Sequence, residues 1–399
     1  MQAVELKKDI YWVGAVDWDL RDFHGYSTEN GSSHNAYLLR GEKNVLFDTV
    51  KASMSSSLIQ NIRRIIEPEK IDYIISNHSE MDHTGALPEI LDLVKPEKLI
   101  CTAEGQKAIV AHFHREDWPF EIVKDGDTLD IGSKTIQFLG TPMLHWPDSM
   151  ASYILEDKIL MCNDIFGQHW ATSERFDDEV DHGELFWQSA KYFVNIFNPT
   201  CGAARKFLAK LESLESTPEM LAVDHGLIWR SGVRKIIDAY RRWSNQETKP
   251  SAVIIYDTMW ESTSKMAQAI GRGIAAEGVS VKLFDLRLNH RSDIMTHVLE
   301  SRAIILGSPV LNKGILPKMA DMLTYMKALK PTGRIGAAFG SYGWADTSVK
   351  QLNAWLEDIK IEIVDPGISV RYVPTDDDIA RCVEVGERIR KTILDRQPS

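Results

Sequence analysis

The chain has 399 residues, of which 44% are hydrophobic and 26% are charged, and its formal net charge is −11. These values are ordinary for a globular protein and exclude bulk disorder, a collagen-like repeat and a coiled coil. A prior of about 150 residues per domain predicts two or three domains. The 46 lysines and arginines, against 57 aspartates and glutamates, form no basic stripe, so we expect no nucleic-acid binding.

The spacing of the cysteines and the composition of the N-terminus indicate the cellular compartment of the protein. The four cysteines lie far apart in the sequence and form no C-x-x-C pair, so neighbouring cysteines build neither a disulfide framework nor a rubredoxin-type iron site. The N-terminus lacks the apolar stretch of a signal peptide, and no apolar run approaches about 18 residues. We therefore expect a cytoplasmic protein without a membrane segment.

Short apolar runs alternate with turns and polar segments in the first part of the chain. Strands are predicted at residues 35–39, 44–47 and 73–75, and a helix is predicted at 58–66. This mixture favours α/β layers over a helical bundle.

A polar stretch ending in proline, residues 243–250, has the composition of a linker. We place the domain boundary there, which predicts a first domain at 1–248 and a second at 249–399. Beyond it, strands and helices are predicted in turn at 252–256, 264–277 (helix), 279–284, 303–307 and 316–328 (helix). Apolar strands that alternate with amphipathic helices predict a doubly wound parallel sheet.

Possible metal ligands are concentrated after the predicted strand 73–75. Residues 77–85 read Asn-His-Ser-Glu-Met-Asp-His-Thr-Gly and place four such side chains within six positions. Alternate residues of a loop can turn towards one centre, and the adjacent Asp-His pair can serve a neighbouring one, so the loop is predicted to contact two metals. Three further possible ligands each end an apolar run: His145, Asp164 and His225.

The pattern His-x-Glu-x-Asp-His, followed by distant His, Asp and His, resembles the metallo-β-lactamase-type fold and, more narrowly, the flavodiiron proteins, also called A-type flavoproteins. The wider hydrolase family has His at the position of Glu80 and usually binds zinc, whereas a carboxylate there adds an oxygen donor that suits iron. Position by position, the resemblance implies one iron on His78, Glu80 and His145, a second on Asp82, His83 and His225, and a bridge by Asp164. In some family members the histidine that matches His83 turns away from the metal.

Side chains near this pattern are candidates to support it. His24, Tyr26 and Tyr192 are hypothesised to orient ligands or to protonate a bound oxygen species, although a role in the core is an equal alternative for each. Trp146 and Pro147 are expected to wall the pocket.

A second site is predicted where the strand at 252–256 runs into the hydroxyl-rich residues 257–264. Hydroxyls and amides at a strand-to-helix turn form an anion site that suits a terminal phosphate. The sequence has neither G-x-x-x-x-G-K-[ST] nor G-x-G-x-x-G, which favours a mononucleotide over a nucleoside triphosphate or a dinucleotide. Loops at 307–312 and 340–344 leave two more parallel strands at the same edge, where such sheets bind ligands.

These loops resemble the flavodoxin-like domain of the flavodiiron family, which implies FMN. The residues that would contact it are Thr258, Met259, Trp260, Ser262, Thr263, Pro309, Val310, Asn312, Ser341, Tyr342, Gly343 and Trp344. Val310 stands where the family commonly has Thr, and Ala345 and Asp346 stand where glycine is frequent, so details of the ring contact are expected to differ.

The resemblance covers essentially the whole chain. It implies an N-terminal metallo-β-lactamase-like αββα domain followed by a C-terminal flavodoxin-like doubly wound sheet. It also implies an oxidoreductase that takes electrons from a separate rubredoxin through FMN to two non-haem irons and reduces O2 to water, NO to N2O, or both. The expected assembly is a head-to-tail homodimer or a dimer of dimers.

Two other functions remain open from the sequence. One is a binuclear-metal hydrolase of the metallo-β-lactamase superfamily with a fused flavin domain, and Glu80 and the flavin loops argue against it. The other is an electron carrier in which only the flavin acts. The residues do not decide between O2 and NO, and we favour O2 with dual activity as an option.

Overall fold

The computed structural model describes residues 2–276 and 278–396. Within these ranges no helix is both long and apolar enough to cross a membrane. The backbone contacts divide the chain into two compact units, which are Met1–His24 with Thr28–Arg241, and Gly25–Ser27 with Arg242–Ser399.

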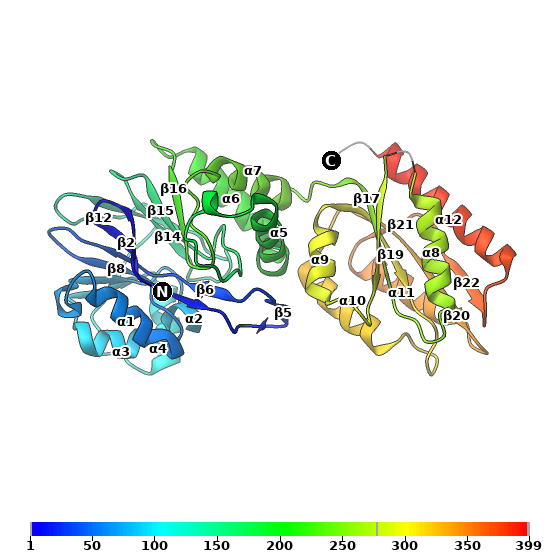
Figure 1. Cartoon of the computed structure of the whole chain (residues 1–399), viewed down its shortest axis with the longest axis horizontal. Helices are drawn as coiled ribbons and strands as arrows, with labels where there is room; N and C mark the ends of the chain where they lie inside the picture. Colours follow the sequence, from blue (N-terminus) through cyan, green and yellow to red (C-terminus); the bar gives the residue numbers. More distant parts are fainter. Residues whose placement is uncertain (1, 277, 397–399) are drawn as a thin grey trace. The chain divides into compact units, whose positions relative to one another are not determined.

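Two β-sheets form the centre of the first unit (Figure 1). The seven-stranded sheet has the order β1 (Val4–Lys7), β2 (Ile10–Trp12), β7 (Tyr37–Leu39), β8 (Val45–Phe47), β9 (Tyr73–Ile75), β10 (Lys98–Cys101) and β11 (Phe120–Ile122). The five-stranded sheet has the order β12 (Thr128–Asp130), β13 (Thr135–Gly140), β14 (Met150–Ile154), β15 (Ile159–Asn163) and β16 (Met220–Val223). The short strands of this unit are β3 (Ala15–Asp17), β4 (Asp22–Phe23) and β6 (Ser32–His34), with β3 paired to β6, whereas β5 (Tyr26–Ser27) falls in the second unit.

Helices cover the outer faces of both sheets (Figure 1). They are α1 (Ser55–Arg63), α2 (Met81–Thr84), α3 (Leu87–Val94), α4 (Ala103–Phe113), α5 (His182–Tyr192), α6 (Cys201–Glu212) and α7 (Val233–Ser244). The predicted strands at 35–39, 44–47 and 73–75 correspond to β7, β8 and β9, and α1 begins three residues before the predicted helix at 58–66.

The apolar runs of the first sheet face two different cores. In β8, Val45 and Phe47 lie in the cluster that also holds side chains of the second sheet, whereas Leu46 packs with the helices on the other face. Successive side chains of a strand point to opposite faces, so a strand buried on both faces must be apolar at every position. This explains why such strands were recognised from short continuous apolar runs.

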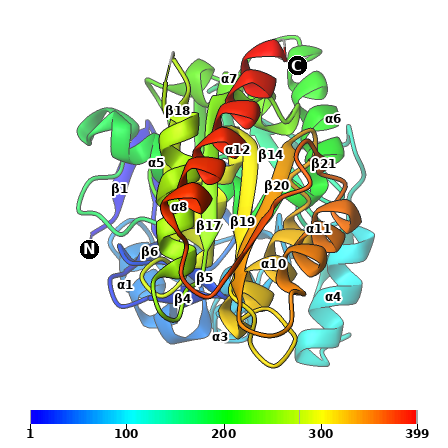
Figure 2. The ribbon, with the colours of Figure 1, turned by 90° about the vertical axis from the view of Figure 1, so that its right-hand side faces the viewer.

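The second unit is built on a parallel sheet (Figure 2). Its strands are in the order β18 (Ser280–Asp285), β17 (Lys249–Tyr256), β19 (Ser301–Gly307), β20 (Ile335–Tyr342) and β21 (Glu362–Ile363), and β22 (Ile368–Arg371) also pairs with β20. β21 pairs with the beginning of β20 and β22 with its end, so the two together occupy one strand position. This is the order of a doubly wound sheet whose direction of growth reverses between β17 and β19.

Helices lie on both faces of this sheet. They are α8 (Ser262–Ile274), α9 (Arg291–Glu300), α10 (Pro317–Leu329), α11 (Ser348–Asp358) and α12 (Asp376–Asp395). Figure 2 shows α8 and α12 side by side in front of the strands, and Figure 1 shows α9 and α10 on the other face. The predicted helix at 264–277 is α8, which begins two residues earlier, and its predicted last residue, Glu277, lies outside the described residues. The predicted linker is shorter than 243–250, because α7 reaches Ser244 and β17 begins at Lys249.

Two glycines let α8 and α12 approach closely. A Cβ atom at Gly386 would lie 2.2 Å from the carbonyl oxygen of Ile270, and one at Gly273 would lie 2.1 Å from that of Val383. Both neighbours are backbone atoms, which cannot move aside as a side chain can.

We predict that Gly386→Val lowers the free energy of unfolding by about 1–3 kcal/mol, because its side chain has no room between the helices. Gly202→Val on α6 is the matched control, since a Cβ atom there meets no atom within 4 Å. Urea denaturation followed by circular dichroism measures both. Equal unfolding midpoints for the two variants would contradict the close approach.

Candidate functional site

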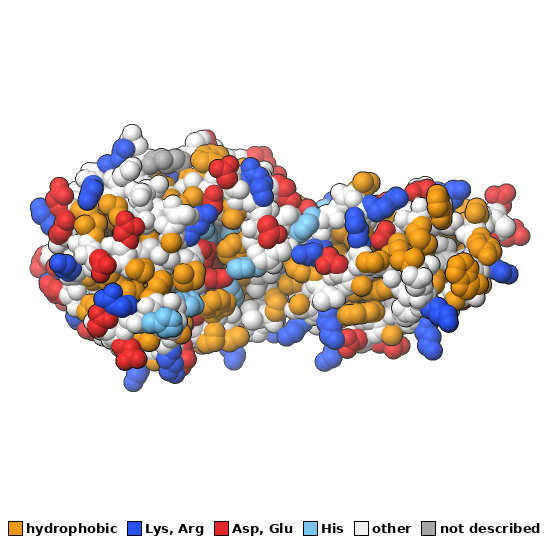
Figure 3. All heavy atoms as spheres, turned by 90° about the horizontal axis from the view of Figure 1, so that it is seen from below, with side chains coloured by type: hydrophobic (Ala, Val, Ile, Leu, Met, Phe, Trp, Pro, Cys, Tyr) orange, Lys and Arg blue, Asp and Glu red, His pale blue; other side chains and the backbone are white. Residues whose placement is uncertain are grey.

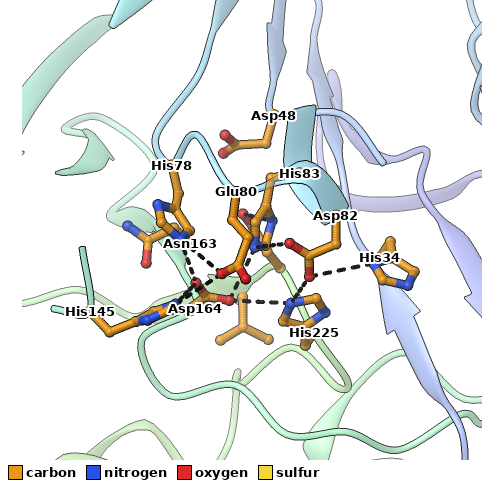
Figure 4. Close-up of polar contacts among 12 residues, drawn as sticks. His34, Asp48, His78, Glu80, Asp82, His83, His145, Asn163, Asp164 and His225 are labelled. Carbon is orange, nitrogen blue, oxygen red and sulfur yellow. Dashed lines mark ion pairs between the residues drawn. The ribbon is translucent and has the colours of Figure 1, made fainter. Parts of the chain in front are cut away.

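The seven predicted metal ligands of the first unit come together at the ends of four strands (Figure 4). His78 and Glu80 lie in the loop after β9, and Asp82 and His83 follow on the short helix α2. The remaining three follow β13, β15 and β16, and they are His145, Asp164 and His225. A single loop and three strand ends therefore converge on one buried centre.

Four of these residues form a first group. The Nε2 atom of His145 lies 3.3 Å from an oxygen of Glu80 and 3.3 Å from Oδ2 of Asp164. The Nε2 atom of His78 lies 3.4 Å from Glu80 and 3.5 Å from the same Asp164 oxygen. These four donor atoms surround a space that suits one ion.

A second group shares Asp164 with the first. The Nε2 atoms of His83 and His225 each lie 3.2 Å from Oδ1 of Asp164. Asp82 lies 3.0 Å from the ring of His225 and 3.4 Å from that of His83. Asp164 therefore turns one oxygen towards each group, and His83 points into its group rather than away from it.

Several donor atoms of the two groups are buried and make no hydrogen bond to the residues that the structure describes. They include Nε2 of His78 and His83, both oxygens of Asp82 and Oδ2 of Asp164. A buried polar atom without a hydrogen bond lowers the stability of the folded protein, and a cation bound between such atoms removes this penalty. Imidazole nitrogens mixed with carboxylate oxygens are donors that suit iron, so the residues fit a pair of metal ions.

Further polar groups fix the orientation of the histidine rings. Nδ1 of His78 lies 3.1 Å from Asp148, Nδ1 of His83 lies 3.2 Å from Asp224, and Nδ1 of His225 donates to the carbonyl oxygen of Ser33 at 2.7 Å. A polar partner at Nδ1 leaves Nε2 as the atom that can bind a metal. The sequence analysis did not assign Asp148 or Asp224 a role, although both are close in sequence to a predicted ligand.

The charges of this centre favour a cation. Burial alone lowers the pKa of His78 and of His225, but the neighbouring carboxylates outweigh it and raise both values to about 10. Burial alone raises the pKa of Glu80, but His145 and His78 outweigh it and lower that pKa to about 2. The carboxylates of the centre therefore favour positive charge on or between these imidazoles.

Two of the three predicted supporting residues contact the ligands. Nε2 of His24 lies 2.9 Å from Glu80, and 70% of the His24 side chain is exposed to solvent. The hydroxyl of Tyr192 is buried and donates to Oδ1 of Asp164 at 2.8 Å. Tyr26 is buried on β5, and its role stays a prediction. Trp146 packs edge-on against His78 with ring centroids 5.1 Å apart, as expected for a pocket wall.

The second unit holds a pocket at the carboxyl ends of its strands. Its volume is about 480 Å³, within the range of sites that bind small molecules. All the predicted flavin residues line it except Thr263, whose hydroxyl lies 3.0 Å from that of Ser341 behind the wall. Ala345, where the resemblance implies an altered ring contact, also lines the pocket, and four wall residues were not predicted: Leu311, Lys313, Tyr372 and Val373.

The walls of this pocket fit a phosphorylated, planar ligand. The hydroxyl oxygen of Thr258 is buried without a hydrogen bond, close to the N-terminus of α8, where an anion is favoured. Trp260 and Trp344 are 88% and 85% exposed and can flank a ring. Tyr372 and Val373 follow β22. This strand has only four residues, two of them polar, and was not recognised from the sequence.

Comparison with known families supports the division into these two sites. Residues 32–226 match the family described as ODP family beta lactamase, and residues 254–386 match the flavodoxin family. The predicted fold class, an N-terminal metallo-β-lactamase-like domain and a C-terminal flavodoxin-like domain, is confirmed.

Individual proteins match over the full length. The chain is 42% identical over 397 residues to the nitric oxide reductase of Moorella thermoacetica, covering 99% of this chain and 100% of that protein. The rubredoxin oxygen:oxidoreductase structure from Desulfovibrio gigas superimposes with a TM-score of 0.96 at 40% identity, covering 99% of this chain and 100% of that one. The flavodiiron protein from Giardia intestinalis gives a TM-score of 0.96 at 31% identity, covering 99% and 97%. The predicted resemblance is confirmed, and this chain belongs to the flavodiiron proteins.

Proposed function

We propose that this protein is an oxidoreductase that takes electrons from a rubredoxin through FMN to two non-haem irons and reduces O2 to water, NO to N2O, or both. The observation that carries the proposal is Asp164, whose two oxygens face two separate groups of histidines and carboxylates. A flavin-sized pocket in the same chain supports it. The names of the relatives from Moorella and Desulfovibrio point to the same two gases.

The bound groups supply redox chemistry: FMN takes up and releases electrons singly or in pairs, and a pair of irons holds a diatomic gas and reduces it. His78, Glu80 and His145 would hold one iron, Asp82, His83 and His225 the other, with Asp164 between them. In the second unit, Thr258 and Ser262 would contact the phosphate, and Trp260 and Trp344 the ring.

The protein's own side chains deliver protons and exclude water. Both reductions consume protons, and Nε2 of His24 contacts Glu80 on one side while most of its ring faces solvent. It can therefore carry protons from solvent to the centre. Tyr192 holds a proton on its hydroxyl next to Oδ1 of Asp164, and Trp146 covers the side of His78.

The two alternative functions are less well supported. A hydrolase needs neither Glu80 in place of an imidazole nor a flavin pocket. An electron carrier does not need buried, unsatisfied donors such as Asp82 and Asp164, which cost stability without a metal.

The donor and the assembly are part of the proposal. A separate rubredoxin is the proposed donor, and a head-to-tail homodimer is the proposed assembly, with a cytoplasmic location that agrees with four cysteines forming no disulfide in the described chain. Figure 3 shows hydrophobic side chains exposed on the second unit, and the rim of its pocket includes Met259, Trp260, Trp344 and Tyr372. An exposed apolar rim supports a partner surface at the flavin.

The direct test is consumption of each gas by the iron- and FMN-loaded protein. With reduced rubredoxin as donor in an anaerobic cell, we expect electrodes to record turnover of O2 and of NO. Protein without donor is the control. Absence of turnover with both gases, in protein shown to contain iron and FMN, would overturn the proposal.

Separate variants should remove the two cofactors independently. Asp164→Ala is expected to lose iron and gas reduction while keeping yellow FMN, because it removes the oxygens shared by both groups. Thr258→Val with Ser262→Ala is expected to weaken FMN binding at least tenfold while keeping iron. Metal analysis and flavin absorbance measure both, and full activity of Asp164→Ala would refute the bridging role.

Tyr192→Phe tests the proton beside Asp164. We expect turnover to fall roughly 10–100-fold, as when an outer partner of a metal ligand is lost, while iron content stays unchanged. Tyr153→Phe is the matched control, since that hydroxyl bonds Ser216 instead. Equal gas-reduction rates in the two variants would show that the Tyr192 hydroxyl is dispensable.

A further inference from the structure

His34 is a buried imidazole beside the metal centre that is not one of the seven ligands. It ends β6 and is 1% exposed. Its Nδ1 atom lies 3.9 Å from Oδ2 of Asp82, and its Nε2 atom lies 3.8 Å from Oδ2 of Asp17. Both distances are too long for hydrogen bonds, and neither ring nitrogen makes one within the described chain. A buried polar ring left in this state needs an explanation.

The surroundings of His34 repeat those of two proposed iron ligands. His78 has one nitrogen towards the centre and a carboxylate, Asp148, behind the other, and His83 has Asp224 in the same place. His34 has Asp82 in front and Asp17 behind, and Lys51 in turn holds Asp17. A carboxylate behind an imidazole is the usual support of a metal-binding histidine.

His34 also lies within reach of two other donors. One donor atom each from His34, Asp82 and His225 all lie within 4.8 Å of one another, and all three residues are buried. Metal–nitrogen and metal–oxygen bonds of about 2.1 Å span up to about 4.2 Å between donors, so small side-chain movements would let one ion contact all three. Figure 4 shows His34 and His83 on opposite sides of Asp82.

We propose that His34, Asp82 and His225 form an outer position for the second metal ion, alternative to the inner position between Asp82, His83, Asp164 and His225. Both positions need the single free nitrogen of His225, so one ion occupies one position at a time. The inference rests on the proposed metal pair and adds a place to which the second ion can move without leaving the protein. An ion at the outer position would bind Nδ1 of His34, which otherwise has no hydrogen bond.

The test weakens the inner position by removing His83 and asks where the second ion goes. Metal-free His83→Ala protein is loaded with two equivalents of Co²⁺ and desalted, and cobalt per chain is measured. We expect two ions in wild type, His34→Ala and His83→Ala, but one in the double variant His34→Ala/His83→Ala. In crystals of His83→Ala, anomalous scattering should place the second cobalt at bonding distance from Nδ1 of His34.

The double variant His83→Ala/His169→Ala is the matched control. His169 is also buried, with its ring centroid 4.9 Å from that of His225, but it belongs to none of the three donor groups. The control variant His83→Ala/His169→Ala should therefore retain two ions. Retained FMN absorbance and circular dichroism show that each variant is folded, and the crystal measurement on His83→Ala does not depend on the double variant.

The outcomes separate this inference from the proposed function. Two ions in His34→Ala/His83→Ala, one ion in His83→Ala, or a second cobalt remote from His34 would overturn the outer position. Wild-type protein that fails to bind two ions would instead overturn the metal pair itself.

Discussion

The structure of the first unit depends on one buried carboxylate. Asp164 follows β15, is fully enclosed, and lies within 3.5 Å of four imidazoles that arrive from three other parts of the chain. Burial raises the pKa of this carboxyl, but the surrounding histidines outweigh burial and lower it well below its usual range. The carboxylate is therefore ionised and holds positive charge around it, either as protons or as metal ions. The sheets must bring their strand ends to this point for its charge to be compensated.

The layers of the sandwich make that convergence possible. Both faces of the first sheet are covered, and its central strands β7, β8 and β9 hold only apolar or aromatic residues, so that polar residues begin only where these strands end. A second set of buried polar groups then fixes the rings. Asp148, Asp224 and the carbonyl oxygen of Ser33 each contact the back of one histidine. These contacts at Nδ1 decide that Nε2 of each histidine faces the centre, and they thereby set the donor atoms that an ion meets.

The sequence predicted the elements and ligands that local patterns specify. β7, β8 and β9 were recognisable because strands buried on both faces are apolar throughout, and the His-x-Glu-x-Asp-His loop was recognisable because its ligands are neighbours in the chain. Some residues whose role depends on distant segments were not found. His34 acquires meaning only through Asp82 and Asp17, and Tyr372 reaches the flavin pocket only because β22 pairs with the end of β20. The linker was overestimated because polar residues 243–250 also end a helix and begin a strand.

The positions of buried polar atoms without hydrogen bonds distinguish residues kept for function from residues kept for stability. In most of a folded protein a buried polar atom finds a hydrogen bond. Here, within the described chain, orphaned nitrogens and oxygens occur in both units, but the largest group of them lies around one point, on His34, His78, Asp82, His83, Asp164 and Asp224. A protein selected for stability alone would replace such groups with apolar side chains of similar volume. Their retention is explained if bound cations accept the free lone pairs of these nitrogens and oxygens. Because His34 belongs to the same group, a centre with only seven ligands does not explain why the His34 imidazole is buried there.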